Sequence, residues 1–187
     1  MPNTAPPPAP EVTIKNLQAA FNGESNARAK YLEFAKKADL DGYQHVASLL
    51  RAAAHAEKIH AENHSRVLNR LGAIPMANIE TPHVSSTAEN LKAAIAGEEY
   101  ERDVMYPEFI KEAEAGRQGA AVTSFMFALA VEAEHAKLYS EALKNLEQMR
   151  TKTTYCVCTT CGFTTENLTG DRCPVCGAHK DKFEKVD

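Results

Sequence analysis

Two Glu-x-x-His motifs lie far apart in this chain, and each follows a copy of a repeated segment. The motifs are Glu57-Lys-Ile-His60 and Glu132-Ala-Glu-His135. The repeated segments, Asn16–Arg28 and Asn90–Arg102, are identical at seven of 13 positions and contain Glu24 and Glu98. Because residues three apart share a helix face, each motif presents a carboxylate and an imidazole together. A duplicated unit with one Glu and one Glu-x-x-His supplies the ligands of a carboxylate-bridged two-metal site.

A further carboxylate, Glu101, follows Glu98 by three residues and completes a set of five carboxylates and two imidazoles. One such motif could arise by chance on an exposed helix, but two in register with a duplicated Gly-Glu pair argue against chance. Five buried carboxylates would repel one another and lose their solvation, so they need cations between them. Two divalent cations would offset most of that charge, and iron or manganese suits carboxylate and imidazole ligands. The candidate ligands are Glu24, Glu57, His60, Glu98, Glu101, Glu132 and His135.

Long helices would bring these ligands together. Apolar periodicity predicts helices over residues 13–39, with Thr13 as N-cap, and over 43–71, 87–115 and 119–148, with turns at 39–42 and 116–119 and a long connection over 73–86. Glu24 and Glu57 lie equally far from the first turn. Glu101 and Glu132 lie equally far from the second turn, so antiparallel pairing places the ligands at one height. The predicted fold class is mainly α, a ferritin-like four-helix bundle with one long crossover.

Other residues on these helices lie close to the predicted ligands. Tyr31 and Tyr106 follow the duplicated Gly-Glu pairs at similar distances, so their hydroxyls would orient the carboxylates, with packed core tyrosines as the alternative. Pro107 removes a backbone donor inside the third helix and predicts a kink or bulge beside the site. We assign no role to His45, His55 and His64. A zinc site on His60 and His64 is the less favoured alternative, since Glu57 competes for the same helix face.

Four cysteines form two Cys-x-x-Cys pairs close together in the sequence. They are Cys158, Cys161, Cys173 and Cys176. Gly162 and Gly177 follow the two pairs and permit the positive φ that turns backbone N–H groups toward sulfur. So short a segment cannot fold on an apolar core alone, and a metal must supply folding energy. Four thiolates suit iron or zinc, and Cys156 lies outside the motif as a bystander.

Composition excludes several classes of function. The chain has 187 residues, a net charge of −4 and scattered basic residues, so we expect no nucleic acid partner. The longest nearly apolar run, residues 119–131, is too short to cross a membrane. Cysteines confined to metal motifs and the lack of a signal-like N-terminus predict a cytoplasmic location. The expected division is a disordered proline-rich tail over residues 1–12, a helical domain over 13–150 and a small metal-knuckle domain over 151–187.

These motifs together resemble the rubrerythrin family along the chain apart from the proline-rich tail. The matching segments are Gly23-Glu-Ser-x-Ala-Arg28, Gly97-Glu-x-x-Glu101, Met105-Tyr-Pro107, both Glu-x-x-His motifs and the Cys-Pro-Val-Cys-Gly ending with Asp181-Lys-Phe-Glu-Lys-Val. The resemblance implies a non-heme di-iron site on the seven Glu and His candidates. It also implies a rubredoxin-like domain with one iron on the four cysteines. In the family, one iron exchanges Glu101 for His60 when reduced, so these two are expected to be alternative ligands.

The resemblance further implies a peroxidase that reduces hydrogen peroxide to water in oxidative stress defence, with electrons relayed through the rubredoxin-like centre. The sequence has no glycine-rich dinucleotide motif after a strand, so we expect electrons from a rubredoxin or from a separate NAD(P)H-dependent reductase. A head-to-tail homodimer, with electron transfer between subunits, is also implied. The alternatives are a ferroxidase or iron-handling protein of the ferritin-like class and a non-catalytic zinc-binding interaction module.

Overall fold

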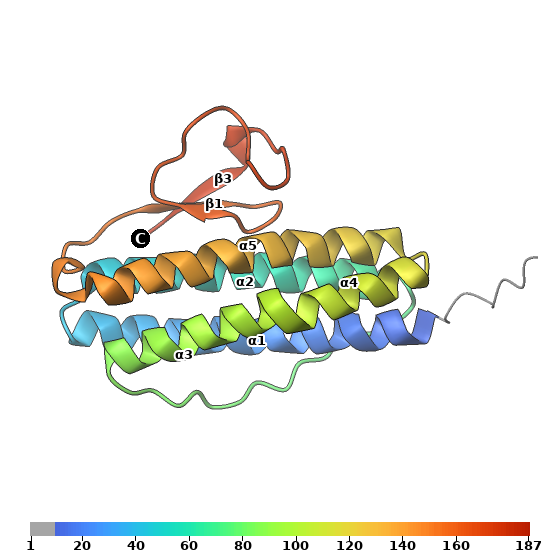
Figure 1. Cartoon of the computed structure of the whole chain (residues 1–187), viewed down its shortest axis with the longest axis horizontal. Coiled ribbons are helices and arrows are strands. Elements are labelled where there is room, and N and C mark those ends of the chain that lie inside the picture. Colours follow the sequence, from blue (N-terminus) through green and yellow to red (C-terminus); the bar gives the residue numbers. More distant parts are fainter. Residues whose placement is uncertain (1–9) are drawn as a thin grey trace, which may run out of the picture.

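The computed structural model describes residues 10–187, and in that part of the chain four long helical rods lie side by side (Figure 1). Three rods are single α-helices and the third in sequence is composite. The elements are α1 (Pro10–Leu40), α2 (Gln44–Arg70), α3 (Thr87–Tyr100), the π-helix η1 (Glu101–Met105), α4 (Tyr106–Ala115), α5 (Gly119–Lys144) and the short 3-10 helix η2 (Leu146–Gln148). An extended segment over residues 71–86 crosses from α2 to α3 along the outside of the bundle (Figure 1). This arrangement confirms the predicted bundle with one long crossover.

Two apolar clusters fill the bundle, with a polar layer between them. The first contains Tyr31, Phe34 and Tyr139, and the second contains Leu17, Tyr106 and Phe125. Along every rod the candidate metal ligands lie where one cluster gives way to the other, with only Ile59 of the first cluster among them. Alanines supply much of both clusters, so the helices approach closely around the layer. The apolar packing on either side therefore holds the polar layer at mid-bundle.

The helix ends differ from the predicted ones at two places. Helix α1 begins at Pro10 rather than Thr13, so residues 10–12 are helical and do not belong to a tail. A proline in the first turn is favourable, because its missing N–H would have no partner there, and Glu11 suits the positive end of the helix dipole. The rest of the predicted tail, residues 1–9, lies outside the described residues. Helix α5 ends at Lys144, earlier than predicted, and continues only as the 3-10 turn η2.

The bulge predicted from Pro107 is present as the π-helix η1. The N–H of Tyr106 donates to the carbonyl of Glu101, five residues back, so one extra residue is accommodated in that turn. Pro107 follows directly, where its missing N–H makes a regular α-helical bond impossible. The wider turn changes the direction in which Glu101 leaves the rod, and this matters for the site described below.

The C-terminal domain is a small sheet that lies on α2 and α5 (Figure 1). Its antiparallel strands are β1 (Tyr155–Cys158), β2 (Thr164–Thr165) and β3 (Phe183–Val186), in the order β2-β1-β3, with the 3-10 helix η3 (Lys180–Lys182) before β3. Tyr155 packs with the bundle core, whereas Phe163 and Phe183 pack with the cysteines. His45 of α2 contacts the Glu166 carboxylate at 2.6 Å. The sheet is thus attached to the bundle by the apolar packing of Tyr155 and by the polar contact between His45 and Glu166.

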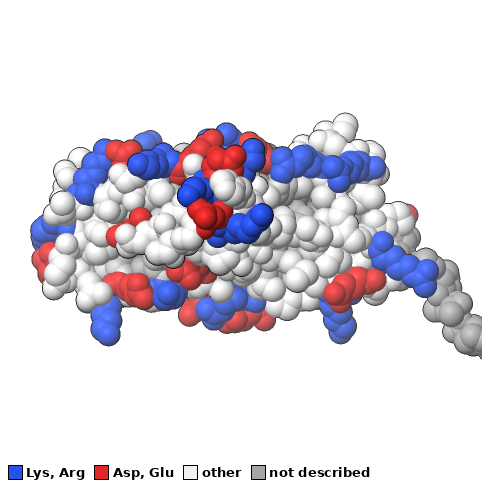
Figure 2. All heavy atoms as spheres, turned by 90° about the horizontal axis from the view of Figure 1, so that it is seen from above, with Lys and Arg blue, Asp and Glu red and all other residues white. Residues whose placement is uncertain are grey.

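Charged side chains of both signs lie across the face that carries the sheet domain (Figure 2). This face has no large region of a single sign (Figure 2). None of the described helices combines the length and the apolar character needed to cross a membrane.

Candidate metal centre

The structure brings six of the seven predicted bundle ligands into two overlapping groups. Within each group the candidate ligand atoms all lie within 4.8 Å of one another. One group is Glu24, Glu57, His60 and Glu132, and the other is Glu57, Glu98, Glu132 and His135. Each helical rod contributes, and every one of these side chains is buried. Residues from both halves of the sequence repeat therefore meet in the polar layer.

Two of the carboxylates contact both histidines, one oxygen to each ring. Glu57 places Oε2 at 2.9 Å from Nδ1 of His60 and Oε1 at 3.3 Å from Nδ1 of His135. Glu132 places Oε1 at 3.0 Å from the first ring and Oε2 at 3.1 Å from the second. Glu24 lies on the His60 side only, at 3.6 Å, and Glu98 on the His135 side only, at 3.8 Å. Two bridging carboxylates with one further carboxylate and one imidazole per side are the donor set of a paired metal site.

The far nitrogens of both histidines bond to the sheet domain. Nε2 of His60 lies 3.0 Å from the carbonyl oxygen of Cys161, which only accepts hydrogen bonds, so Nε2 carries a proton. Nε2 of His135 lies 3.2 Å from Oγ1 of Thr164, whose own proton goes to the carbonyl of Gly162. Each ring therefore donates from Nε2, and in a neutral ring Nδ1 turns its lone pair toward the carboxylates. This orientation by an outer hydrogen bond is typical of metal-binding histidine.

Several buried polar atoms of the layer have no hydrogen-bond partner among residues 10–187. They are Oε2 of Glu24, both carboxylate oxygens of Glu57, Nδ1 of His60 and Oε1 of Glu132. Buried oxygen and nitrogen atoms without partners are strongly unfavourable in a protein interior. These atoms point toward two common positions, and a cation at each position would bind them and remove the cost of burying them without partners. The residues therefore fit a pair of metal ions.

Charge interactions in the layer favour positive charge between the carboxylates. Burial raises the pKa of Glu98 well above its usual range, and the neighbouring carboxylates add to the rise. Burial acts the same way on Glu132, but the charge of His60 and the hydrogen bond and charge of His135 outweigh it and lower the pKa of Glu132. For His135, burial is outweighed by the charge of Glu57 and by hydrogen bonds, which raise its pKa to about 9. Protons on the histidines thus offset the negative charge of the carboxylates, which is what bound divalent cations would do.

Glu101 is the one predicted ligand that lies outside both groups. It leaves the rod from the π-helix η1, and its Oε1 lies 4.0 Å from the position that a Cβ on Gly23 would occupy. Burial and the charge of Glu24 raise the pKa of Glu101 well above its usual range. The predicted exchange between Glu101 and His60 stays a prediction.

The two tyrosines donate hydrogen bonds to the outer carboxylates. The hydroxyl of Tyr31 donates to Oε1 of Glu98 at 2.5 Å, and that of Tyr106 donates to Oε1 of Glu24. Sequence reasoning missed a third residue here, His64, which is fully buried beside Tyr106 and Glu24. Its spacing from His60, one turn along α2, was the available sign that it faces the same layer.

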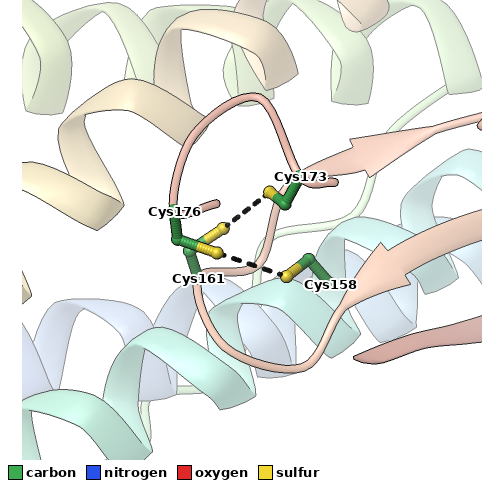
Figure 3. A group of neighbouring side chains, drawn as sticks. All are labelled: Cys158, Cys161, Cys173 and Cys176. Atoms are coloured by element: carbon green, nitrogen blue, oxygen red, sulfur yellow. Dashed lines mark hydrogen bonds between the residues drawn. The ribbon is translucent and has the colours of Figure 1, made fainter. Parts of the chain in front are cut away.

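The four predicted cysteines come together within the sheet domain (Figure 3). The Sγ atoms of Cys158 and Cys176 lie 3.6 Å apart, as do those of Cys161 and Cys173. A hydrogen bond from Cys161 lowers the pKa of the Cys158 thiol to about 5, so one thiolate is available at neutral pH. Cys156 is not in the group. Four sulfurs within reach of one point fit a single tetrahedral iron or zinc ion.

Family models match both parts of the chain. The model described as Rubrerythrin matches residues 15–143, and the one described as Rubrerythrin, rubredoxin-like domain, matches residues 157–184. Rubrerythrin-2 of Clostridium acetobutylicum is 34% identical over 178 residues, which cover 92% of this chain and 96% of that protein. Nigerythrin of Nitratidesulfovibrio vulgaris is 34% identical over 172 residues, which cover 91% of this chain and 85% of that protein.

Solved structures agree with these relatives. The fully reduced, all-ferrous state of nigerythrin superposes with a TM-score of 0.86 at 33% identity, covering 92% of this chain and 86% of that one. The bacterioferritin BfrA of Mycobacterium tuberculosis reaches a TM-score of 0.67 at 21% identity, which shows a shared fold only. The family's cofactors, an iron pair and a single iron on four cysteines, are those that the two residue groups fit. The chain belongs to the rubrerythrin family of oxidoreductases.

Proposed function

We propose that this chain is a peroxidase that reduces hydrogen peroxide to water at the bundle layer, with electrons relayed through the four-cysteine centre. The observation that carries the proposal is the contact of His60 with both centres. Its Nδ1 faces the candidate iron ligands, and its Nε2 donates to the carbonyl of Cys161, itself a candidate iron ligand. One side chain thus joins a site suited to two-electron chemistry to a site suited to one-electron transfer.

The reaction consumes one peroxide, two electrons and two protons and gives two waters. A bound iron pair would supply both electrons at once, and a single iron in four thiolates would return them one at a time. We assign the ligand roles in the bundle to Glu24, Glu57, His60, Glu98, Glu132 and His135, with Glu101 as the exchanging ligand. The single iron is assigned to Cys158, Cys161, Cys173 and Cys176.

The remaining residues of the layer hold the ligands in place. Glu57 and Glu132 keep the two sides of the site at a fixed separation by contacting both histidines. Tyr31 and Tyr106 donate to the outer carboxylates and hold their orientation. The apolar clusters above and below exclude water, so that the charges of the layer interact strongly. A rigid donor set with one movable carboxylate suits a site that changes its charge by two.

We further propose that electrons arrive from a rubredoxin or from an NAD(P)H-dependent reductase, and that the chain forms a head-to-tail homodimer. Within one chain the two centres are already in contact through His60, so transfer inside a subunit is available as well as transfer between subunits.

The proposal is tested on the iron-loaded, fully reduced protein under anaerobic conditions. Mixing with stoichiometric hydrogen peroxide should oxidise the iron pair much faster than mixing with air-saturated buffer. A ferroxidase would show the reverse preference and would go on to accumulate a mineral of many irons per chain. A zinc-binding module would stay colourless, whereas ferric iron in four thiolates is red. Either the reversed preference with a mineral of many irons or a colourless protein would overturn the proposal.

A further inference from the structure

We propose that Ser124 and His64 form a proton path that leads from a surface pocket to the Glu24 side of the bundle site. This inference rests on the proposed function, because peroxide reduction consumes protons inside a layer closed off by apolar side chains. Neither residue belongs to the metal ligands assigned above. The path uses a continuous row of hydrogen bonds that the ligand set alone does not require.

The row consists of four side chains from four helical elements. Nδ1 of His64 lies 2.8 Å from Oγ of Ser124, and its Nε2 lies 3.1 Å from the hydroxyl oxygen of Tyr106. That hydroxyl in turn donates to Oε1 of Glu24. His64, Tyr106 and Glu24 are fully buried, and Ser124 is 5% exposed. Only the serine end of the row therefore approaches the surface.

The serine end opens on a surface pocket between α2 and α5. The pocket has a volume of about 270 Å³, and its lining includes Ser124, Thr123, Asn63, Arg66 and Arg70. Polar side chains at its rim would keep water in the pocket, where it can exchange protons with the serine hydroxyl. The pocket thus supplies the solvent contact that the buried layer lacks.

A proton passes along the row so that Ser124, His64 and Tyr106 keep their net charge and only Glu24 gains a proton. A hydronium ion in the pocket gives a proton to Oγ of Ser124 and remains as water, and Ser124 gives its own proton to Nδ1 of His64. The imidazole releases the proton on Nε2 to the oxygen of Tyr106, which gives its proton to the carboxylate of Glu24. One O–H or N–H bond forms and one breaks at each relay group, and one proton has moved from pocket to carboxylate. Rotation of the hydroxyls and exchange of the ring tautomer reset the row.

The other half of the sequence repeat has no such extension. Tyr31 donates to Glu98 in the same way that Tyr106 donates to Glu24. On that side, however, the hydroxyl of the neighbouring Tyr139 has no hydrogen-bond partner among the described residues, and the surroundings are apolar. The Glu98 side of the layer is thus packed without a histidine–serine pair such as His64 and Ser124. The presence of such a pair on the Glu24 side alone points to proton supply from that side.

The turnover experiment compares variants of one hydroxyl in the iron-loaded full chain. Ser124→Ala breaks the row and should lower peroxide turnover by about tenfold or more, a modest share of what proton transfer contributes to catalysis. It should also raise the solvent deuterium isotope effect. Ser124→Thr keeps a hydroxyl and should recover most of the rate. The control is Thr123→Val, because Thr123 lines the same pocket but bonds only to the carbonyl of Gly119 in its own helix.

A second measurement is independent of turnover. In the full chain loaded with zinc at both centres, ¹⁵N-histidine NMR reports how fast the ring N–H of His64 exchanges with water. Ser124→Ala should slow this exchange by about tenfold or more, and Ser124→Thr and Thr123→Val should leave it close to wild type. Unchanged exchange and an unchanged isotope effect in Ser124→Ala would overturn the path. If the wild type reduces no peroxide, the proposed function fails, while the exchange comparison still decides whether the path exists.

Discussion

The bundle layer and the four-cysteine domain obtain their metal-binding groups in opposite ways. The bundle ligands are spread from Glu24 to His135, and two large apolar clusters position them. The four cysteines lie between residues 158 and 176, and in the part of the chain that the structure describes the small cluster around them has Val131 as its one fully buried residue that is not a cysteine. The bundle should therefore fold around its ligands before metal arrives, whereas the sheet domain needs metal to fold. The difference predicts that metal loss affects the stability of one region and the activity of the other.

The largest expected effect is on the sheet domain. Cys161→Ser removes one thiolate and should unfold this domain, because a structural metal contributes about 10 kcal/mol or more to such small folds. NMR should show the loss of dispersed signals from residues 155–187 while the helical content of the bundle persists. Cys156→Ser is the matched control and should change neither, since Cys156 is not in the group. A folded sheet domain in Cys161→Ser would contradict the contrast between the two regions.

The next effect is on metal binding in the bundle. Glu57→Gln removes the charge of a carboxylate that contacts both histidines, so both bundle metals should be lost. Turnover should fall by more than about 100-fold, beyond the loss seen for outer hydrogen-bond partners. Metal analysis should find the single iron of the four-cysteine centre retained. Glu62→Gln changes an exposed carboxylate on the same helix and should behave as wild type. Full iron content in Glu57→Gln would show that Glu57 is not a ligand.

A smaller effect tests the contact between the two regions. A Cβ on Gly162 would lie 2.6 Å from Nε2 of His60, whereas one on Gly177 would meet nothing within 4 Å. Both glycines have positive φ, so both alanine variants lose about 1–2 kcal/mol of stability. Only Gly162→Ala should also slow electron transfer between the centres, by about tenfold or more. Stopped-flow absorbance of the thiolate iron after peroxide addition measures this rate, and equal rates in the two variants would exclude the His60 contact as the route.

The smallest effect is the pH dependence of the stability of the bundle without metal. The pKa of His135 rises from 6.5 to about 9, and that of Glu98 lies well above 4.5, so the folded bundle binds these protons more tightly than the unfolded chain. Stability from such groups is lost as pH rises. Chelated protein should therefore melt about 5 °C or more lower at about pH 9 than at about pH 6. Circular dichroism measures the melting temperature, and iron-loaded protein should show little of this dependence. A rise in melting temperature over this range would contradict the buried charge layer.

The features of the fold and the site that depend on local spacing could be predicted from the sequence. The helix-face spacing of Glu57 with His60, the two Cys-x-x-Cys pairs and the midpoints of the two hairpins follow from periodicity, and the bundle topology followed from them. Pro107 likewise predicted a bulge, because a proline inside a helix always removes a backbone donor. These are properties of neighbouring residues, so one sequence is enough to infer them.

The parts that depend on contacts between distant segments were not accessible. Nothing in the sequence relates His60 to the carbonyl of Cys161, because a backbone carbonyl has no residue type. His64 is distinguished from His45 and His55 of α2 by its contacts with Ser124 and Tyr106, which lie 60 and 42 residues away. The position of Glu101 outside the ligand groups depends on the π-turn that carries it. Packing between rods decides these features.

We expect the two bundle irons and the one thiolate iron to act together on peroxide. The most direct measurement is an anaerobic titration of the fully reduced, iron-loaded protein with hydrogen peroxide, followed by visible absorbance. Each peroxide should accept two electrons, and the red ferric thiolate colour should develop until all three irons are oxidised. A protein in which peroxide leaves the thiolate iron reduced, or in which dioxygen oxidises the bundle irons faster than peroxide does, would contradict this expectation.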